Sequence, residues 1–363
     1  MSIILTSYCI LLLMLQIGWH KAIHQREVSK SAFYPFISVL IPVRNERERI
    51  ANVLIALSKQ QYNNFEVIVI NDHSSDDTVD VAKKNSFANV SVITSNGRGK
   101  KAALDAGIKI AKGELIATTD ADCIMDEHWL ESIRKAFANE KTVFAFGAVA
   151  IDARGGFFSR VQSVEFASLV GSGAATSALG FPTMCNGANL AYRKEVYESV
   201  NGYEGNTHIA SGDDEFLMRK IIRTHPHGVT FIPFTSACVT TCAQQSLSDF
   251  LSQRMRWASK WKFNTSFHTV ALALYIFAVQ ASVLSGAVSL FVSFSFAIVL
   301  LFVIKLFLEA SFISRVCRFS KSHFSWPAFL FLQLVYPLYV VLIGLVANFS
   351  RPSWKGRPVS NKG

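Results

Sequence analysis

The sequence predicts an α/β fold, with a Rossmann-like domain built on a mostly parallel sheet and flanked by transmembrane helices. Three observations lead to this prediction. Between residues 36 and 119, short apolar runs alternate with segments of helical spacing. Polar clusters stand where three of these apolar runs end. Uncharged apolar stretches long enough to cross a bilayer occur towards both ends of the chain.

The composition indicates a membrane protein. Of 363 residues, 50% are hydrophobic and 29 are phenylalanine, which is more apolar than an ordinary soluble enzyme. The net charge of +10 is compatible with nucleic acid, but no basic motif with interleaved aromatic residues occurs. We therefore expect a membrane surface and a phosphate-bearing substrate as partners, and no nucleic acid. The 6 cysteines form no Cys-x-x-Cys pair and are expected to be free thiols.

Residues 1–20 are predicted to form an N-terminal transmembrane anchor. Residues 3–19 carry no charge, and a helix of that length roughly crosses a hydrocarbon core. No basic segment precedes them and no small-x-small cleavage site follows, so a cleaved signal peptide is the lesser alternative. Lys21, Arg26 and Lys30 come next, and by the positive-inside rule the following domain is cytoplasmic. We expect an integral protein of a bacterial inner membrane.

The cytoplasmic domain is predicted to cover residues 36–266 and to begin with alternating strands and helices. Strands that alternate with helices of this length form a mostly parallel sheet with helices on both faces. Ligands in such sheets bind at the carboxyl ends of the strands. The predicted strands are 36–43, 65–70, 90–94 and 114–119. The predicted helices are 44–59, 77–85 and 101–111.

The second half of this domain is less regular. A loop rich in small residues is expected at 180–192. The last helix has a serine at its start, so we expect a cap at Ser246 or Ser248. The further predicted strands are 143–151, 229–232 and 237–241, and the further helices are 157–173, 213–223 and 246–263.

Residues 267–349 are predicted to form a C-terminal membrane region of about three apolar segments. Residues 268–312 are long enough for two spans, and 327–348 form another, followed by a basic tail at 350–363. Three spans after a cytoplasmic domain place this basic tail outside, against the positive-inside rule. Either one apolar segment is re-entrant or interfacial, or the long segment crosses differently.

Two carboxylates, Asp120 and Asp122, follow the fourth predicted strand. Residues i and i+2 of a strand-like segment point to the same side. Two such anions repel unless a cation lies near them. A hard divalent cation with oxygen ligands, Mg²⁺ or Mn²⁺, fits this pair and can also hold a diphosphate. The alternative is a pair of solvated loop carboxylates.

Lys100 and Lys101 follow a glycine-rich turn at the start of a predicted helix. A helix N-terminus with nearby lysines suits a phosphate electrostatically. The spacing is not that of a Walker A motif, which excludes the ATPase interpretation. The alternative is two ordinary surface lysines.

Gln253, Arg256 and Trp257 are spaced at i, i+3 and i+4, so they share one face of the last helix. The guanidinium can clamp a diphosphate, the amide can hydrogen-bond to it, and the indole can support an acceptor. The alternative is an interfacial helix whose Arg and Trp lie at the lipid headgroups. His225 and His227 could hold a metal, but we favour the interpretation that they are ordinary surface residues. His208 matches no motif.

The order of these motifs resembles that of membrane-embedded family 2 glycosyltransferases of GT-A fold, which end in Gln-x-x-Arg-Trp. The resemblance covers roughly residues 36–260. It implies that Asp72 contacts uracil, that Asp120 lies near the ribose, and that Asp122 binds the metal and diphosphate. It implies Asp214 as the catalytic base, with Asp213 beside it; the alternative is that these acids only stabilise the helix N-terminus. The other implied donor-binding residues are Pro42, Asn45, Glu46, Lys100, Gln253 and Arg256, and the implied acceptor-binding residues are Trp257, Asn186 and Asn189.

The function implied by this resemblance is inverting transfer of a sugar from a nucleotide-diphosphate donor, UDP-linked, to a lipid or lipid-linked glycan of the cell envelope. One alternative is a processive polysaccharide synthase of the cellulose or hyaluronan type, although about four spans are few for a polymer channel. A second is a non-catalytic membrane scaffold that retains the fold. The sugar, the acceptor and the oligomeric state stay open.

Overall fold

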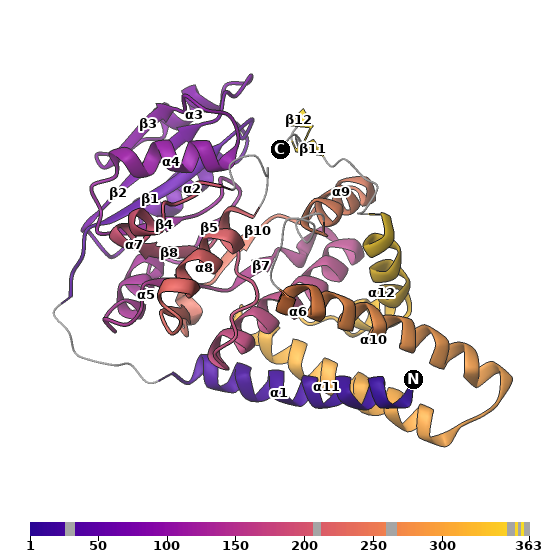
Figure 1. The fold of residues 1–363 in the computed structure, drawn as a ribbon. Coiled ribbons are helices and arrows are strands. Elements are labelled where there is room, and N and C mark those ends of the chain that lie inside the picture. The colour runs from indigo at the N-terminus through magenta and orange to yellow at the C-terminus, as the bar shows by residue number, and fades with distance from the viewer. Residues whose placement is uncertain (26–32, 206–211, 259–266, 347–352, 355–356, 359–363) are drawn as a thin grey trace. The chain divides into compact units, whose positions relative to one another are not determined.

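The structure, a computed structural model, describes residues 1–25, 33–205, 212–258, 267–346, 353–354 and 357–358 (Figure 1). Arg26, Lys30, His208 and most of the basic tail lie outside these residues. The chain divides into two compact units. The sheet unit contains His20–Ala150 and Thr176–Cys242. The helical unit contains Met1–Trp19, Ile151–Ala175 and Ala243–Val359, so the predicted range 36–266 contributes to both.

The sheet unit is organised around one mostly parallel sheet of seven strands, in the order β3-β2-β1-β4-β8-β6-β9. Only β8 runs antiparallel to both of its neighbours, β4 and β6. The α/β prediction is therefore confirmed. The strands are β1 (Ile37–Val43), β2 (Phe65–Asn71), β3 (Val90–Thr94), β4 (Leu115–Thr118), β6 (Phe144–Phe146), β8 (Leu190–Arg193) and β9 (Val229–Phe231).

Helices pack on this sheet through their buried faces. Helix α4 lies against β1 and β2. It approaches closely at Gly107, where an added Cβ would lie 2.9 Å from Ile70 Cδ1 and 3.3 Å from Leu40 Cδ2. The helices of this unit are α2 (Ile50–Ser58), α3 (Thr78–Lys84), α4 (Lys100–Ile110), α5 (Trp129–Ala136), α7 (Lys194–Ser199) and α8 (Asp213–Thr224), with a short 3-10 turn at Thr235–Ala237.

A second, small sheet has the strand order β5-β10-β7, with β5 at Ile124–Met125, β10 at Val239–Thr241 and β7 at Val149–Ile151. Strand β10 pairs antiparallel with β5, in a register that joins Val239 to Met125 and Thr240 to Ile124. This pairing brings the end of β10 beside the residues that follow Asp120.

Three local predictions differ from the structure. The single strand expected at 143–151 is two strands, β6 and β7, which are interrupted at Gly147 and Ala148 and belong to different sheets. At the interruption the backbone packs tightly on Asn189, because an added Cβ at Gly147 would lie 2.4 Å from Asn189 Nδ2. The helix expected from residue 44 begins at Ile50, because Asn45 has a φ of 52° and starts a loop. Strand β8 begins at Leu190, inside the predicted loop 180–192, and ends one residue beyond it at Arg193.

The helical unit contains most of the long helices. Among the residues that the structure describes, four helices are long and apolar enough to cross a membrane, which supports membrane association: Ser2–Ile23, Val270–Val292, Phe296–Phe319 and Trp326–Gly344. The helix bounds are α1 (Ser2–Ile23), α6 (Phe157–Ala178), α9 (Leu247–Ala258), α10 (Phe267–Val292), α11 (Phe296–Phe319) and α12 (Trp326–Val346), preceded at α6 by a 3-10 turn (Ala153–Gly155). Near the C-terminus, β11 (Ser353–Trp354) pairs antiparallel with β12 (Arg357–Pro358).

Aromatic and polar contacts join α1, α11 and α12. The rings of Trp19 and Phe319 meet edge to face at 5.3 Å. Tyr8 Oη donates to Glu309 Oε1 at 2.8 Å. Lys305 Nζ lies 2.9 Å from Glu309 Oε2 and 2.7 Å from Gln333 Oε1. Charged side chains buried between apolar helices in this way are costly unless they are paired.

Candidate active site

Asn45 and Glu46 join the loop after β1 to the loop after β2. Asn45 Oδ1 accepts a hydrogen bond from the backbone N–H of Ser75 at 2.8 Å. The Glu46 N–H donates to Thr78 Oγ1 at 2.8 Å. Pro42 lies one residue before the end of β1. These residues shape the carboxyl edge of the sheet, which is where ligands bind in parallel α/β folds.

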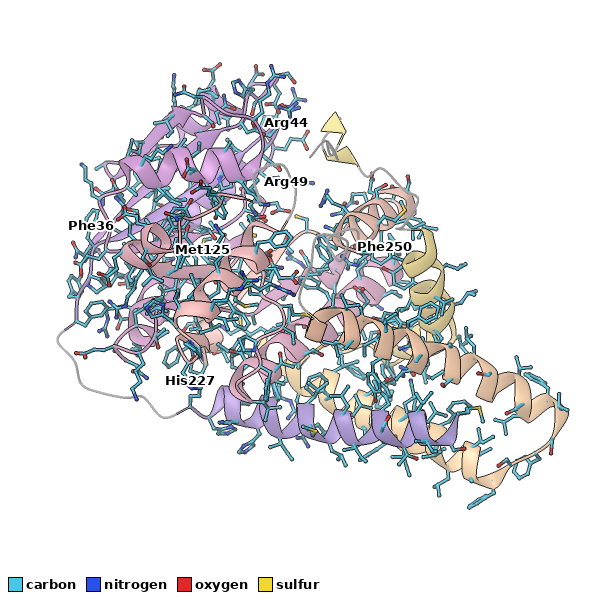
Figure 2. All side chains as sticks on the ribbon, viewed as in Figure 1. Phe36, Arg44, Arg49, Met125, His227 and Phe250 are labelled. Atoms are coloured by element: carbon cyan, nitrogen blue, oxygen red, sulfur yellow. The ribbon has the colours of Figure 1, made fainter. Side chains whose placement is uncertain are left out.

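Asp72 is buried at the end of β2, with 1% of its surface exposed. Its Oδ1 accepts from the N–H of Gly99 at 2.9 Å, and Arg44 Nη1 donates to its carbonyl oxygen at 2.9 Å. Gly99 has a φ of 95°, a conformation that favours glycine. Asp72 thus holds the glycine-rich turn that opens α4. Figure 2 labels Arg44 and Arg49, the first and last residues of the loop between β1 and α2.

Lys100 bridges two carboxylates from different elements. Its Nζ lies 2.7 Å from Asp120 Oδ1 and 3.3 Å from Asp213 Oδ2. Burial alone would lower the pKa of the Lys100 ammonium, but the two carboxylates outweigh it and raise the pKa above its ordinary value. Lys101 is buried over the ring of Phe216, with Nζ 5.1 Å from the ring centroid. The alternative of two surface lysines is therefore wrong.

Asp213 and Asp214 begin α8 and lie beside Gly187. Asp214 Oδ2 accepts from the Gly187 N–H at 3.0 Å, and its Oδ1 accepts from the Glu215 N–H at 2.7 Å. An added Cβ at Gly187 would lie 2.8 Å from Asp213 Oδ2 and 3.3 Å from Lys100 Nζ. Only glycine lets the backbone approach these side chains so closely. Lys100, Asp120, Asp213 and Asp214 therefore form one polar cluster.

Asp122 is oriented by a threonine that the sequence did not indicate. Thr241 Oγ1 on β10 donates to Asp122 Oδ2 at 2.9 Å. No group of three or more His, Cys, Asp or Glu side chains suited to a metal occurs among the described residues. Mg²⁺ in phosphate-transfer sites is commonly held by one or two carboxylates together with substrate phosphates. Asp120 and Asp122 fit this donor set.

Asn186 and Asn189 are placed in different surroundings. Asn189 is fully buried. Its Nδ2 donates to the carbonyls of Ala148 at 2.8 Å and Ala237 at 2.7 Å. Its Oδ1 accepts from Trp129 Nε1 at 3.0 Å. Every polar group of this side chain is satisfied by protein, so we leave Asn189 out of the acceptor site. Asn186 is half-buried, and its Oδ1 accepts from the Ala188 N–H at 2.9 Å.

Gln253, Arg256 and Trp257 lie on α9, in the helical unit. The start of this helix is capped as predicted, because Ser246 Oγ accepts from the Asp249 N–H at 3.0 Å. The other predicted site residues lie in the sheet unit. Of the histidines described, His227 is exposed and His225 contacts Thr224 Oγ1 at 2.9 Å.

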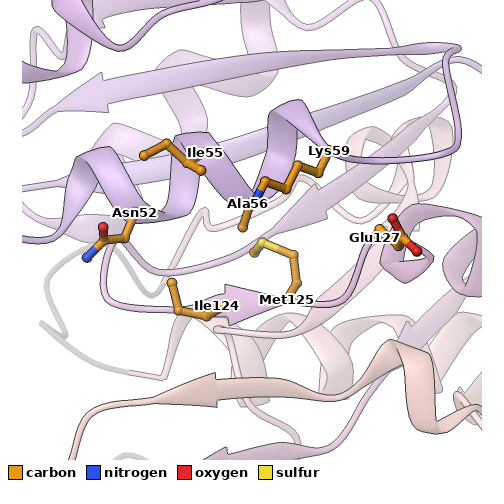
Figure 3. Close-up of a pocket in the computed structure, with 7 residues that line it drawn as sticks. All are labelled: Asn52, Ile55, Ala56, Lys59, Ile124, Met125 and Glu127. Carbon is orange, nitrogen blue, oxygen red and sulfur yellow. The ribbon is translucent and has the colours of Figure 1, made fainter.

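A cavity of about 280 Å³ lies between α2 and β5 (Figure 3). Its lining is mostly apolar and contains none of the predicted site residues. We therefore do not assign it to the donor. The lining residues are Asn52, Ile55, Ala56, Lys59, Ile124, Met125 and Glu127.

Comparison with known proteins agrees with this architecture. Residues 38–200 match the family model for glycosyl transferase family 2. The glycosyltransferase AglE of Haloferax volcanii is 31% identical over 196 residues, which are 50% of this chain and 59% of AglE. A poly-beta-1,6-N-acetyl-D-glucosamine synthase of Staphylococcus epidermidis is 26% identical over 257 residues, which are 66% of this chain and 59% of the synthase. The match thus spans about six tenths of the length of either relative.

The fold also matches a solved structure. The mannosyltransferase PcManGT of Pyrobaculum calidifontis, solved in complex with GDP-Man and Mn²⁺, aligns with a TM-score of 0.58 and 16% identity, covering 96% of this chain and 97% of that one. At this identity the likeness concerns the fold alone. Together, the family model, the named relatives and the fold show that this chain carries a glycosyl transferase family 2 domain of GT-A type, combined with apolar helices long enough to cross a membrane.

Proposed function

We propose that this chain is an inverting glycosyltransferase that moves a sugar from a nucleotide-diphosphate donor to a lipid or lipid-linked glycan. The observation that carries the proposal is the cluster of Lys100, Asp120, Asp213 and Asp214 at the carboxyl edge of the sheet. The Lys100 ammonium lies among carboxylates at the edge where ligands bind. This arrangement suits an anionic ligand that is held partly by a metal ion on the carboxylates.

The donor nucleotide is assigned to the ends of β1 and β2. Asp72, whose Oδ1 already orders the turn at Gly99, is the residue proposed to contact the base. Asn45 and Glu46 shape the adjoining loop, and Asp120 is proposed to lie near the ribose. We propose uracil as the base; PcManGT was solved with GDP-Man, so guanine donors belong in the test.

Asp122 and Asp120 are proposed to hold Mg²⁺ or Mn²⁺. When bound, the cation would neutralise negative charge on the leaving diphosphate. Thr241 Oγ1 donates to Asp122 Oδ2, and the Cys123 thiol contacts Asp122 Oδ1 at 3.7 Å. We propose that Oδ1 exchanges this weak thiol contact for the cation. Lys100 supplies a second positive charge close to the same carboxylates.

Asp214 is proposed as the general base. As the acceptor hydroxyl oxygen bonds to the anomeric carbon, the bond from that carbon to the diphosphate oxygen breaks, and Asp214 takes the hydroxyl proton. Two backbone N–H groups, of Gly187 and Glu215, hold the Asp214 carboxylate in place. Asp213 pairs with Lys100 and is the weaker candidate for this role.

Residues 1–20 and 267–349 are proposed to anchor the chain in a bacterial inner membrane, with 36–266 on the cytoplasmic side. Gln253 and Arg256 on α9 are proposed to bind the leaving diphosphate, and Trp257 to support the acceptor. The four candidate spans among the described residues, in a chain that also carries a transferase domain, favour a lipid acceptor.

A second candidate function is processive polysaccharide synthesis. It is favoured by the similarity to a poly-beta-1,6-N-acetyl-D-glucosamine synthase over 66% of this chain. The two functions differ in the length of the product, since single transfer yields a lipid with one added sugar and processive synthesis yields polymer from the donor alone.

The test is nucleotide release by the full chain in detergent with Mn²⁺. UDP- and GDP-linked sugars are supplied with and without a membrane lipid extract, and Asp214→Asn is the control. Lipid-dependent release from one donor, lost in the variant, is the expected result. Polymer made from donor alone favours the synthase. Absence of release and of nucleotide binding for every donor would contradict both functions.

A further inference from the structure

A buried ion pair lies inside the Gln253–Trp257 motif. Arg254, which stands between the motif residues, is 4% exposed, and Glu165 on α6 is equally buried. The two side chains meet through a pair of parallel contacts, Nε to Oε1 at 3.1 Å and Nη2 to Oε2 at 2.6 Å. Such a bidentate contact fixes the plane of the guanidinium as well as its position.

The fixed guanidinium touches two of the three motif side chains. Arg254 Nη1 donates to Gln253 Oε1 at 2.7 Å. Its guanidinium carbon lies 4.3 Å from the ring centroid of Trp257, within the range of a cation–π contact. Phe166, next to Glu165 on α6, packs against the same indole at 5.9 Å between ring centroids.

These contacts orient the Gln253 amide. Since its oxygen accepts from Arg254, the group that Gln253 can offer to an anion is its NH₂. The indole of Trp257 has one face against the guanidinium, which sets its tilt. All of these residues belong to the helical unit, so the arrangement is built within one part of the chain.

We propose that Glu165 and Arg254 are positioning residues for the transfer reaction. Glu165 fixes Arg254, and Arg254 presents the Gln253 NH₂ to the leaving diphosphate and sets the Trp257 ring for the acceptor. The inference rests on the proposed function for its catalytic consequence. The contacts that it invokes exist without substrate and can be measured separately.

The first measurement is fluorine NMR of the full chain labelled with 5-fluorotryptophan in detergent. The chain has 6 tryptophans, and the Trp257→Phe variant assigns the Trp257 signal. In Glu165→Gln, the Trp257 signal is expected to shift by more than its line width, while the other signals stay in place. Glu165→Asp keeps the carboxylate and is expected to give a smaller shift. Glu131→Gln, which removes the partner of Arg134 in the sheet unit, is the matched control and should leave the Trp257 signal unchanged.

The second measurement is the kcat and KM of the same variants for the donor. At metal sites, loss of the group that orients a ligand commonly lowers activity by about 10- to 100-fold, and we take the same scale for the groups that orient Gln253 and Trp257. A loss of about 10-fold in kcat is expected for Glu165→Gln, with partial recovery in Glu165→Asp. Gln253→Glu keeps an acceptor for Arg254 but removes the donor group, so it should lose activity without a shift of Trp257.

A Trp257 signal that does not move in Glu165→Gln overturns the proposal. A signal that moves while kcat stays at the wild-type value overturns the catalytic part of it. If the wild-type chain releases no nucleotide from any donor, the proposed function fails, whereas the fluorine signal still decides whether the pair orients Trp257. If Glu165→Gln does not fold, the Trp257 fluorine shift and the kcat are measured on Glu165→Asp instead.

Discussion

The ammonium nitrogen of Lys100 lies 2.7 Å from Asp120 Oδ1, so the first acid of the Asp-x-Asp pair is neutralised from within the chain. The same nitrogen lies 3.3 Å from Asp213 Oδ2. Lys100 therefore holds together acids that come from the end of β4 and the start of α8. The acidic cluster is thus assembled around a cation that the chain itself supplies.

Lys100→Met is expected to destabilise the fold by about 1–3 kcal/mol, because the two partly buried carboxylates lose their counter-ion. Mn²⁺ should raise the melting temperature of this variant more than that of the wild type, since the acidic cluster without its lysine gains affinity for a cation. Thermal unfolding in detergent at several Mn²⁺ concentrations measures both effects. Lys109→Met is the matched control, because Lys109 pairs with Asp105 at the surface. An equal response to Mn²⁺ in Lys100→Met and wild type would show that Lys100 does not neutralise these acids.

Thr241→Val is expected to raise the Mn²⁺ concentration for half-maximal activity by about 10-fold, because Asp122 loses the hydroxyl that orients it. Thr241→Ser keeps the hydroxyl and should behave as the wild type. Thr240→Val, at the neighbouring position of β10, is the control. Activity titrated with Mn²⁺ at saturating donor tests this, and unchanged metal dependence in Thr241→Val would remove Thr241 from the site.

Asp214→Asn is expected to lower kcat by about 10²- to 10⁴-fold, the usual contribution of a general base. Asp213→Asn should act mainly on the donor KM, because Asp213 is paired with Lys100. Glu215→Gln is the control at the third acid, which pairs with Arg219. Steady-state kinetics of the three variants assign the base, and a larger loss of kcat in Asp213→Asn than in Asp214→Asn would reverse the assignment.

Asn189→Ala is expected to destabilise the fold by about 3 kcal/mol or more. The change leaves the buried Trp129 N–H without its acceptor and removes the amide donor from the carbonyls of Ala148 and Ala237, of which the Ala148 carbonyl still accepts from the Val239 N–H. Asn186→Ala should have a small effect on stability, because Asn186 is half-buried. Denaturant unfolding of the two variants compares them directly. If Asn189→Ala unfolds like the wild type and loses only activity, the residue belongs to the acceptor site after all.

Local patterns predicted much of the sheet, and non-local contacts account for what the sequence could not show. The strand at Val90–Thr94 and the cap at Ser246 were predictable because apolar runs and capping chemistry act over a few neighbouring residues. Thr241 was missed because its contact with Asp122 depends on the pairing of β10 with β5. Asn186 and Asn189 have the same side chain in one short motif, and only the packed fold separates the half-buried one from the fully buried one.

The pairing inside the helical unit follows the same logic, because no local pattern links Glu165 to Arg254 or Tyr8 to Glu309. In each case a charged side chain lies in a buried segment, and the sequence pattern indicates only that this charge needs a partner. The partner is 89 residues away for Arg254 and 301 residues away for Tyr8. A sequence can therefore indicate that a buried charge is paired without showing which helix supplies the pair.

The pair of Lys305 and Glu309 in α11 yields the last prediction. Lys305→Met alone should be strongly destabilising, by about 3–5 kcal/mol, because it leaves the Glu309 carboxylate buried without its counter-ion. The double change Lys305→Met with Glu309→Leu should recover most of this loss, since apolar side chains suit a segment that crosses a membrane. Tyr8→Phe removes one hydrogen bond to Glu309 and should cost about 1 kcal/mol. Thermal unfolding of the wild type and these three variants in the same detergent measures the differences. A double variant no more stable than Lys305→Met would mean that the two charges do not act as a pair and that each is held by other groups.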